Sequence, residues 1–445
     1  MSVRGLDVHL YGEHVARVRA GTRAEFAFTE QSLARWGYGS AVLSVLLPLT
    51  DRTSGPLSAR ARVWLSGLLP EGRARTRMAE RAGVDPDDLL GFLAVYGRDT
   101  AGAVVLVPAG EDPSPDGQEP VPVSDEGIGL MLDEAAAHGA ADQLTSIGGL
   151  EAKVALTSTS DGFAMPTPTR PSTHIIKLSR PAGSRTADLI DTECAALDLA
   201  RRVGVGTVEA QVGDFAGRRA PVVRRYDRIT GGHGIDRVHQ EDSAQALGID
   251  TGDPDRKFQY GRGLPSLAAV ARALDTLGVD TSALLALTTF NLVIGNTDAH
   301  ARNISLLHMA DGGHALAPAY DVAMHTHHDH ADRRFAMDVA GRRGMAELTG
   351  RDLVDEGSGW GLSSTRAARV VATNLDLIDQ ALRDVDRSEH AGVSDLAWGT
   401  VVQRAERLRA TAPAARPRGS GRRVPGSDGA AVSEGGLEPP PPFED

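Results

Sequence analysis

The chain has 445 residues, of which 41% are hydrophobic and 24% are charged, and its formal net charge at pH 7 is -12. This length and apolar content are enough to bury a sizeable core in two or three lobes. The acidic balance excludes a broad DNA-coating surface, because non-specific affinity for nucleic acid comes mainly from Lys and Arg side chains on phosphates. No apolar run approaches the length of a membrane span, and residues 1–21 carry charges without a signal-peptide core, so we expect a cytoplasmic protein with no membrane contact.

Residues 1–107 form a first predicted unit. Strand-like runs flank Tyr11-Gly12-Glu13, which predicts a β-hairpin. The run Ala41–Leu49 is also strand-like, a helical pattern follows Pro70, and another strand is expected at Ala103–Val107. Polar groups are too sparse in this unit for a catalytic site, so we expect it to bind a partner or to serve as a scaffold.

Residues 108–123 contain five prolines together with acids and glycines, which indicates an exposed linker. A second predicted unit, residues 124–230, begins with a helix at Asp125–Ala137. A small-residue segment, Ser146-Ile147-Gly148-Gly149-Leu150-Glu151-Ala152-Lys153, then precedes a strand-like run. Such a segment could place backbone N–H groups over phosphates. It is neither a Walker A motif nor G-x-G-x-x-G, so a plain hairpin turn also explains it.

A lysine interrupts the apolar strand predicted at His174–Leu178. Lys177 could simply face solvent, but protein kinases place their phosphate-pairing lysine on such a strand. A helix is expected at Asp191–Arg202, and Glu193 falls on its apolar face with Ala196 and Ala200. Glu193 could therefore pair with Lys177, or it could be a first-turn acid that favours the helix dipole. The strand Pro221–Arg225 follows and leads into Tyr226-Asp227, where a hinge between two kinase lobes would lie.

Two carboxylates and an amide are expected to converge in the third unit, residues 231–410. An apolar helix at Ser282–Ile294 ends at Gly295, and a predicted hairpin then carries the chain from the polar cluster Asn296–Asn303 to Asp321. Asp298 and Asn303 have the D-x-x-x-x-N spacing of a kinase catalytic loop, in which the aspartate accepts the substrate proton and the asparagine binds Mg²⁺. Asp321 is the candidate second ligand, since Mg²⁺ prefers hard oxygen donors. Alternatively, these residues only cap and turn the chain.

The histidine-rich segment His325–His330 suggests a different class of site. Imidazoles and a carboxylate at this spacing could bind a transition metal, as in a metal-dependent hydrolase. Short His-rich loops are usually exposed, however, and no second ligand cluster accompanies this one in the sequence. The only cysteine, Cys194, lies in a helical pattern and is expected to be a packed thiol. Helices are predicted at Ser364–Arg383 and Val393–Ala410, and residues 411–445 lack apolar periodicity and should be disordered.

Taken together, the motifs resemble the HipA family, the serine/threonine kinase toxins of type II toxin–antitoxin modules. The resemblance extends from about residue 3 to residue 410 and is carried, in family order, by Gly97-Arg98-Asp99, Ser146–Leu156, His174–Leu178, Arg225–Arg228, His239–Asp242, Asn296–Asn303 and Tyr320–Val322. The chain departs from the family pattern at Glu151-Ala152, where Gln-Glu is usual, and at Arg224, where an acid is frequent.

The resemblance implies a function for most of the candidate residues. Asp298 would be the catalytic base, Asn303 and Asp321 would bind Mg²⁺, and Ser146 would be an autophosphorylated serine in a phosphate-binding loop. The residues implied to surround ATP are Ser146, Gly148, Gly149, Lys153, Lys177, Glu193, Arg225, Tyr226, Asp227 and His300, with Asp227 near the ribose.

The sequence therefore predicts an α+β, bilobal kinase-like fold with an additional N-terminal β-rich subdomain and a mostly helical C-terminal lobe. The expected function is ATP- and Mg²⁺-dependent phosphorylation of a protein, with aminoacyl-tRNA synthetases as the family's substrate class. The expected partner is a HipB-like helix-turn-helix antitoxin, through which any contact with DNA would be indirect. Two alternatives remain, a catalytically weak antitoxin-binding module and a metal-dependent hydrolase that uses His325–His330.

Overall fold

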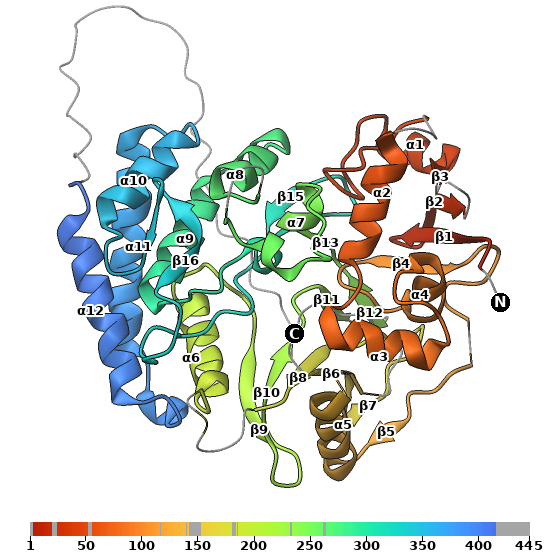
Figure 1. The fold of residues 1–445 in the computed structure, drawn as a ribbon, viewed down its shortest axis with the longest axis horizontal. Helices are drawn as coiled ribbons and strands as arrows, with labels where there is room; N and C mark the ends of the chain where they lie inside the picture. The colour runs from red at the N-terminus through yellow and green to blue at the C-terminus, as the bar shows by residue number, and fades with distance from the viewer. Residues whose placement is uncertain are drawn as a thin grey trace, which may run out of the picture.

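The computed structural model describes residues 3–19, 25–51, 56–115, 117–138, 140–141, 153–179, 184, 186–231, 234–260 and 264–414. Helices and antiparallel sheets are both prominent, so the predicted α+β class is confirmed. Figure 1 shows the N-terminal unit on one side, the helical C-terminal unit on the other, and the largest sheet between them. Among the described residues, no helix combines the length and apolarity that crossing a membrane requires.

The N-terminal unit is an antiparallel sheet covered by helices. Its strand order is β3-β2-β1-β4, with β1 at Gly5–Leu10, β2 at Glu13–Arg19, β3 at Glu25–Phe28 and β4 at Val104–Pro108. The predicted hairpin is present, because Tyr11 and Gly12 adopt the positive φ angles (53° and 77°) that a tight turn requires. The helices are α1 Glu30–Trp36, α2 Pro56–Gly67, α3 Gly72–Ala82 and α4 Leu89–Tyr96, and apolar side chains of sheet and helices share one core.

The strand predicted at Ala41–Leu49 is wrong. This segment is irregular, although Val42, Leu43 and Leu47 are buried in the N-terminal core. A distant carboxylate replaces a neighbouring strand as its hydrogen-bond partner: Glu241 accepts from the Ser44 hydroxyl at 2.6 Å and from the Val45 backbone N–H at 2.7 Å. The apolar pattern predicted the burial of these side chains correctly, but it does not indicate which groups form hydrogen bonds with the backbone of the segment.

The central sheet has the strand order β5-β7-β6-β8-β10-β9. Its strands are β5 Pro122–Val123, β6 Lys153–Thr159, β7 Gly162–Ala164, β8 His174–Lys177, β9 Ala210–Asp214 and β10 Arg219–Arg224, and α5 (Asp125–His138) and α6 (Leu189–Arg202) pack on it. Strands β6 and β8 are antiparallel, and their register places Lys153 directly opposite Lys177. Like charges at opposite positions repel, so this pair favours an anion or carboxylates nearby.

The C-terminal unit is mostly helical. A small sheet, β13 (His239–Asp242), β14 (Ser305–His308) and β15 (His314–Leu316), leads into it, and β14 and β15 form the predicted hairpin before Asp321. Helix α9 spans Ser282–Ile294, as predicted. The remaining elements are β11 Arg228–Gly231, β12 Gly234–Arg237, α7 Ser243–Ala246, η1 Pro254–Lys257, α8 Leu267–Thr276, η2 Ala301–Asn303, β16 Arg334–Val339, β17 Arg342–Gly344, α10 Gly350–Gly359, α11 Ser364–Asp384, η3 Arg387–His390 and α12 Asp395–Thr411.

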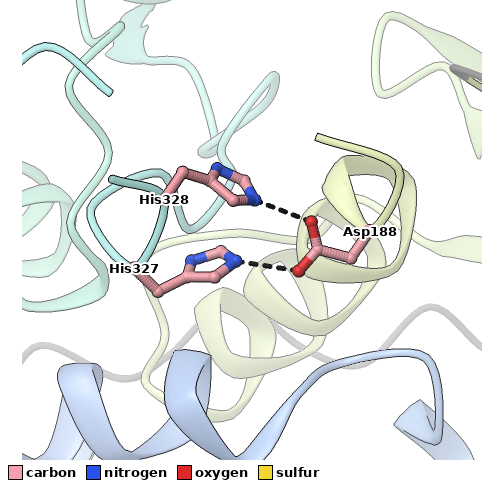
Figure 2. A group of neighbouring side chains, drawn as sticks. All are labelled: Asp188, His327 and His328. Atoms are coloured by element: carbon pink, nitrogen blue, oxygen red, sulfur yellow. Dashed lines mark hydrogen bonds and ion pairs between the residues drawn. The ribbon is translucent and has the colours of Figure 1, made fainter. Parts of the chain in front are cut away.

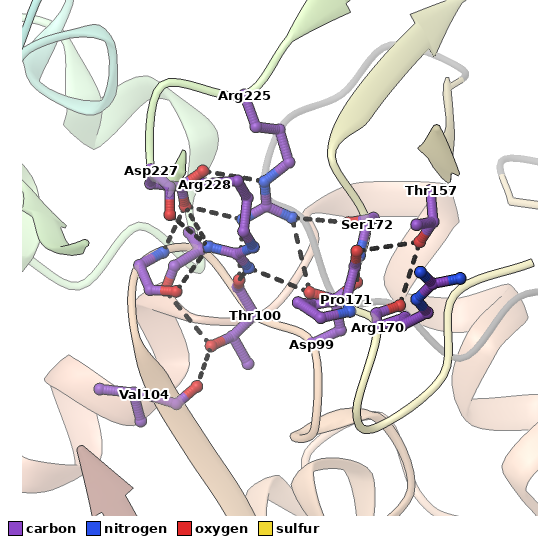
Figure 3. Close-up of polar contacts among 12 residues, drawn as sticks. Asp99, Thr100, Val104, Thr157, Arg170, Pro171, Ser172, Arg225, Asp227 and Arg228 are labelled. Carbon is purple, nitrogen blue, oxygen red and sulfur yellow. Dashed lines mark hydrogen bonds and ion pairs between the residues drawn. The ribbon is translucent and has the colours of Figure 1, made fainter. Parts of the chain in front are cut away.

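A buried cluster of charges joins the N-terminal unit to the segment after β10 (Figure 3). Arg225 donates to both carboxylate oxygens of Asp227, at 2.9 and 2.7 Å, and Arg228 lies 3.0 Å from the same carboxylate. The N-terminal unit contributes the backbone N–H of Gly102, which donates to Asp227 at 2.7 Å, and the carboxylate of Asp99, which accepts from Arg228 at 3.0 Å. Burial raises the pKa of Asp227, but the two arginines outweigh burial and hold that pKa below its ordinary value. Asp227 is thus ionised, and the cluster joins the two units.

Replacing Asp227 with Ala should lower the free energy of unfolding by roughly 3–5 kcal/mol, because Arg225 and Arg228 would be left buried without their main counter-charge. Urea denaturation followed by circular dichroism measures this change. Asp280→Ala is the matched control, since Asp280 is an exposed aspartate that pairs with Arg366 and accepts from the Ser282 backbone N–H, and its loss should cost only about 1 kcal/mol. Equal stability losses for the two variants would contradict the assignment of the cluster.

Candidate active site

The loop after helix α9 is held in one conformation by its own asparagines. Gly295 ends the helix with φ of 77°, and a Cβ there would come within 2.3 Å of the Thr326 hydroxyl, so glycine is required on two counts. Asn296 donates to the Asn291 side chain at 2.7 Å and accepts from the backbone N–H of Asp298 at 3.0 Å. Buried helix residues therefore fix the point at which the Asp298 side chain leaves the loop.

A hydrogen bond from the Asn303 side chain to the Asp298 backbone joins these two residues. The Asn303 amide nitrogen donates to the Asp298 carbonyl at 2.9 Å, which leaves the amide oxygen as the group that can bind a cation. The Asp298 side chain is 49% exposed, so a substrate can reach its carboxylate. His300 Nε2 lies 3.8 Å from that carboxylate, but burial, assisted by the charges of Lys257 and Arg302, lowers the pKa of His300 to about 3. His300 is therefore neutral at ordinary pH.

Arg302 supports the loop from inside the protein. Its guanidinium donates to Asp242 at 2.9 Å and to the carbonyl of Gly67 at 2.8 Å, and it also contacts Glu71 of the N-terminal unit. The Tyr320 hydroxyl donates to the Arg302 carbonyl at 2.8 Å. Tyr320 directly precedes Asp321, so this hydrogen bond links the loop of Asp298 to the candidate metal ligand.

Lys177 lies between two carboxylates that come from different parts of the chain. Its ammonium group donates to Glu193 Oε1 at 2.6 Å and also to Asp321 Oδ1. Lys177 and Glu193 are buried, whereas the Asp321 side chain is 43% exposed. Desolvation raises the pKa of Asp321, but Lys177 and Lys153 outweigh it and hold that pKa well below its ordinary value. The predicted contact of Lys177 with Glu193 is present, and a second contact with Asp321 joins it.

Asp321 has a backbone conformation that side chains rarely adopt. Its φ is 52°, in the left-handed region, which aspartate tolerates better than most residues. Such strain persists only where the surroundings impose it, and it concentrates at functional sites. The conformation directs an exposed carboxylate toward Lys177. Asp321 and the Asn303 amide oxygen are hard oxygen donors, so their chemistry fits Mg²⁺.

The other predicted nucleotide-binding residues lie in different parts of the structure. Ser146, Gly148 and Gly149 lie outside the described residues, whereas Lys153 lies on β6 opposite Lys177. Tyr226 packs against Tyr320, with ring centroids 5.3 Å apart, and its hydroxyl contacts Gln240. Arg225 and Asp227 belong to the buried cluster of Figure 3.

The burial of Asp227 bears on its predicted position near a ribose. Only 2% of Asp227 is exposed, and both of its oxygens already accept hydrogen bonds. A ligand contact through this carboxylate would have to displace a buried guanidinium. The observed geometry favours a structural role for Asp227, and its contact with a nucleotide stays a prediction.

Sequence reasoning missed the supporting partners of this site. Glu71 precedes Arg302 by 231 residues, and no local pattern links the two. Asp242 lies in the segment His239–Asp242, but the resemblance gave no indication that its side chain holds the loop. The loop at His325–His330 is expected from the sequence to be exposed, with no second ligand cluster to accompany it. Asp329 and His330 are exposed, but the expectation of exposure is wrong for His327 and His328, whose side chains are only 4% and 8% exposed and contact Asp188 (Figure 2).

Comparison with known proteins gives matches over both parts of the chain. The model of the HipA N-terminal domain matches residues 6–107, and that of the HipA-like C-terminal domain matches residues 145–385. The protein Y4mE of Sinorhizobium fredii is 29% identical over 402 residues, which are 86% of this chain and 93% of that protein. The serine/threonine-protein kinase toxin HipA of Shewanella oneidensis is 27% identical over 354 residues, which are 75% of this chain and 78% of the toxin.

One solved structure matches nearly the whole fold. It is the complex of HipA, HipB and operator DNA from Shewanella oneidensis MR-1, with a TM-score of 0.74, 21% identity, and coverage of 91% of this chain and 99% of that chain. The predicted kinase-like α+β architecture is thereby confirmed. This likeness concerns the fold alone.

The packing of α6 around Glu193 can be tested through the adjacent thiol. Burial, assisted by the charges of Glu193 and Asp191, raises the pKa of Cys194 to about 12, so the thiolate fraction at pH 8 should be roughly one in ten thousand. Iodoacetamide at pH 8 should label the native chain at least a hundredfold more slowly than the chain in guanidinium chloride. Because the chain has a single cysteine, mass spectrometry gives an unambiguous readout. Similar rates in the two states would show that α6 packs differently.

Proposed function

The chain belongs to the HipA family, and on that basis we propose that it is an ATP- and Mg²⁺-dependent serine/threonine protein kinase that acts as the toxin of a type II toxin–antitoxin module. The observation that supports this most is the Lys177 ammonium between Glu193 and Asp321. A lysine that is fixed by a helical glutamate and lies against the aspartate that would hold Mg²⁺ is the arrangement that protein kinases use for phosphoryl transfer. The name of the Shewanella oneidensis relative, a serine/threonine-protein kinase toxin, supports the same proposal.

In the proposed reaction, Asp298 accepts the proton of a serine or threonine hydroxyl. The hydroxyl oxygen then forms a bond to the γ-phosphorus of ATP while the bond from that phosphorus to the β-phosphate bridging oxygen breaks. An exposed carboxylate on a loop fixed by Asn296 can take this role without a change in the fold. The neutral state of His300 leaves Asp298 as the charged base of the loop.

Lys177 and Lys153 supply positive charge where phosphates would lie. Their register on β6 and β8 gives two ammonium groups at opposite positions, and Glu193 fixes one of them. Asp321 and the Asn303 amide oxygen would hold Mg²⁺, which would offset the charge of the phosphates when bound. The Asp321 carboxylate stays ionised because its pKa is held below the ordinary value, as a metal ligand requires.

The proposed partners follow from the family. The protein substrate would come from the aminoacyl-tRNA synthetase class, and a HipB-like helix-turn-helix antitoxin would bind the kinase and carry any contact with DNA. Ser146 is the proposed site of autophosphorylation, although it lies outside the described residues. Two alternatives remain: a catalytically weak antitoxin-binding module, which the departures at Glu151-Ala152 and Arg224 favour, and a metal-dependent hydrolase that uses His325–His330.

Asp298→Ala should lower phosphate transfer from ATP by about 10²- to 10⁴-fold while leaving the fold intact, because an exposed loop carboxylate is lost and no core side chain changes. Transfer to the chain itself, with the modified residue identified by mass spectrometry, measures the effect and also tests Ser146. Asp311→Ala is the control, since Asp311 lies in the exposed turn of the following hairpin. Undiminished transfer by Asp298→Ala would exclude the assigned base. No transfer by the wild-type chain would favour the binding module.

Asp321→Asn should remove most of the Mg²⁺ dependence of ATP binding, because the amide lacks the negative charge that offsets the cation. Calorimetric titrations of ATP with and without Mg²⁺ measure this dependence in the variant and the parent. Asp332→Asn, which changes a surface aspartate that pairs with Arg334, should retain the parent's dependence. If Asp321→Asn retains it as well, the metal ligand lies elsewhere.

A further inference from the structure

Two histidines and an aspartate meet at a point that the kinase reaction does not use. His327 Nε2 lies 2.8 Å from Asp188 Oδ2, and His328 Nε2 lies 2.7 Å from Asp188 Oδ1 (Figure 2). The three side chains come from segments about 140 residues apart in sequence, and each can offer one ligand atom, all within 4.8 Å of one another. The two imidazoles are buried, and the Asp188 side chain is 25% exposed.

The Asp188 side chain does not cap helix α6, although it occupies the capping position. Asp188 occupies the N-cap position of α6, where an aspartate side chain ordinarily accepts from a backbone N–H of the first turn. No such hydrogen bond forms at this helix, and both oxygens of the carboxylate face the imidazoles instead. The helix thus forgoes a capping bond, typically worth about 1 kcal/mol, at the position where the carboxylate meets the two histidines.

The histidines are held in place by the residues around their loop. Arg333 donates to the backbone carbonyl of His328 at 3.0 Å and also contacts the Thr326 carbonyl. The Thr326 hydroxyl in turn accepts from Arg404 of α12 at 2.7 Å. A fixed loop that presents two imidazoles is a suitable metal-binding element.

We propose that Asp188, His327 and His328 bind one Zn²⁺ ion, which fastens the loop after Asp321 to the N-terminus of α6. Two imidazole nitrogens and one carboxylate oxygen, with water in the fourth position, are a common Zn²⁺ ligand set. At metal–ligand distances of about 2.0–2.2 Å, neighbouring ligand atoms in a tetrahedral site lie about 3.3–3.5 Å apart. The observed contacts of 2.7 and 2.8 Å are made to different oxygens of Asp188, and one ligand atom from each of the three residues lies within 4.8 Å of the others, so rotation of the Asp188 side chain would bring one oxygen to the required distance from both imidazoles.

The site lies on elements that also carry the proposed nucleotide site. Glu193 follows Asp188 on the same helix by five residues, and His327 follows Asp321 by six. Bound Zn²⁺ would therefore restrain both segments that supply carboxylates to Lys177. The proposal that Zn²⁺ binds here does not rest on the proposed kinase function. The inference that bound Zn²⁺ supports nucleotide binding by Lys177 does rest on it.

The test compares the wild-type chain with His327→Gln/His328→Gln after treatment with a chelator and dialysis. Glutamine amides can still donate hydrogen bonds to Asp188, but they are poor zinc ligands, so this variant separates a hydrogen-bonded contact from a metal site. Calorimetric titration with Zn²⁺, without nucleotide, should give one tight site in the wild type. The double variant should lose at least a hundredfold in affinity at that site, as should Asp188→Asn, which retains a good N-cap residue.

His330→Ala is the matched control, because His330 is an exposed histidine of the same loop that stacks near His328 without contacting Asp188. It should bind Zn²⁺ within about threefold of the wild type, since the three ligands remain. Hydrogen exchange should slow on Zn²⁺ addition in residues 322–333 and at the start of α6, in the wild type and in His330→Ala only. Absence of a tight site in the wild type, or equal affinity in the double variant, would overturn the proposal and leave a hydrogen-bonded contact.

Because these readouts need no ATP, the two proposals can fail separately. A chain that binds Zn²⁺ as described but transfers no phosphate would retain the metal site and lose the kinase assignment. A chain that transfers phosphate but binds no Zn²⁺ would do the reverse.

Discussion

The position of one ammonium group, that of Lys177, constrains most of the site. A buried lysine is costly unless carboxylates surround it, and Glu193 and Asp321 meet this requirement from two distant segments. Because a buried ion pair adds little net stability over apolar packing, its main effect here is geometric. Strand β8, helix α6 and the segment after the β14–β15 hairpin must adopt one relative arrangement for Lys177 to reach both partners. The left-handed backbone of Asp321 is the local cost of that arrangement.

The N-terminal unit takes part in the same scaffold through a second set of buried charges. Asp99 and the backbone of Gly102 contact the arginines and aspartate that follow β10, and Glu71 contacts Arg302 beside Asn303. Each of these contacts joins residues more than 120 apart in sequence, so each forms only when the units are assembled. Buried charges tolerate few alternative partners, which fixes the relative position of the units more strictly than apolar contact would. The scaffolding role expected for residues 1–107 is consistent with this arrangement.

The parts of the structure that sequence predicted are those set by local physics. Helix α9 begins and ends where apolar periodicity and Gly295 place its ends, and the position of Glu193 on the apolar face of α6 correctly indicated a buried carboxylate. The sequence predictions fail where a residue distant in sequence determines the local structure. Glu241 accepts from the Val45 backbone N–H in the irregular segment Ala41–Leu49, and Asp188 contacts His327 across about 140 residues. The nucleotide-binding roles depended on the family resemblance, because spacing such as that of Asp298 and Asn303 is common in ordinary turns.

Helix α6 connects the Asp188–histidine cluster to the Lys177 site. Asp188 at its start contacts the histidines of the loop that follows Asp321, and Glu193 contacts Lys177. Lys177 contacts Asp321, which returns the chain of contacts to the beginning of the same loop. On the same helix, Asp191 is paired with Arg219 of β10 at 2.7 Å, and Asp198 lies 3.3 Å from His390. A displacement of α6 away from the loop would therefore break both the Asp188–His327 contact and the Glu193–Lys177 contact. Glu193 and Asp321, the two carboxylates that hold Lys177, are therefore coupled in position. The contact of Asp188 with His327 and His328 connects the start of α6 to the loop after Asp321, a few residues from each carboxylate.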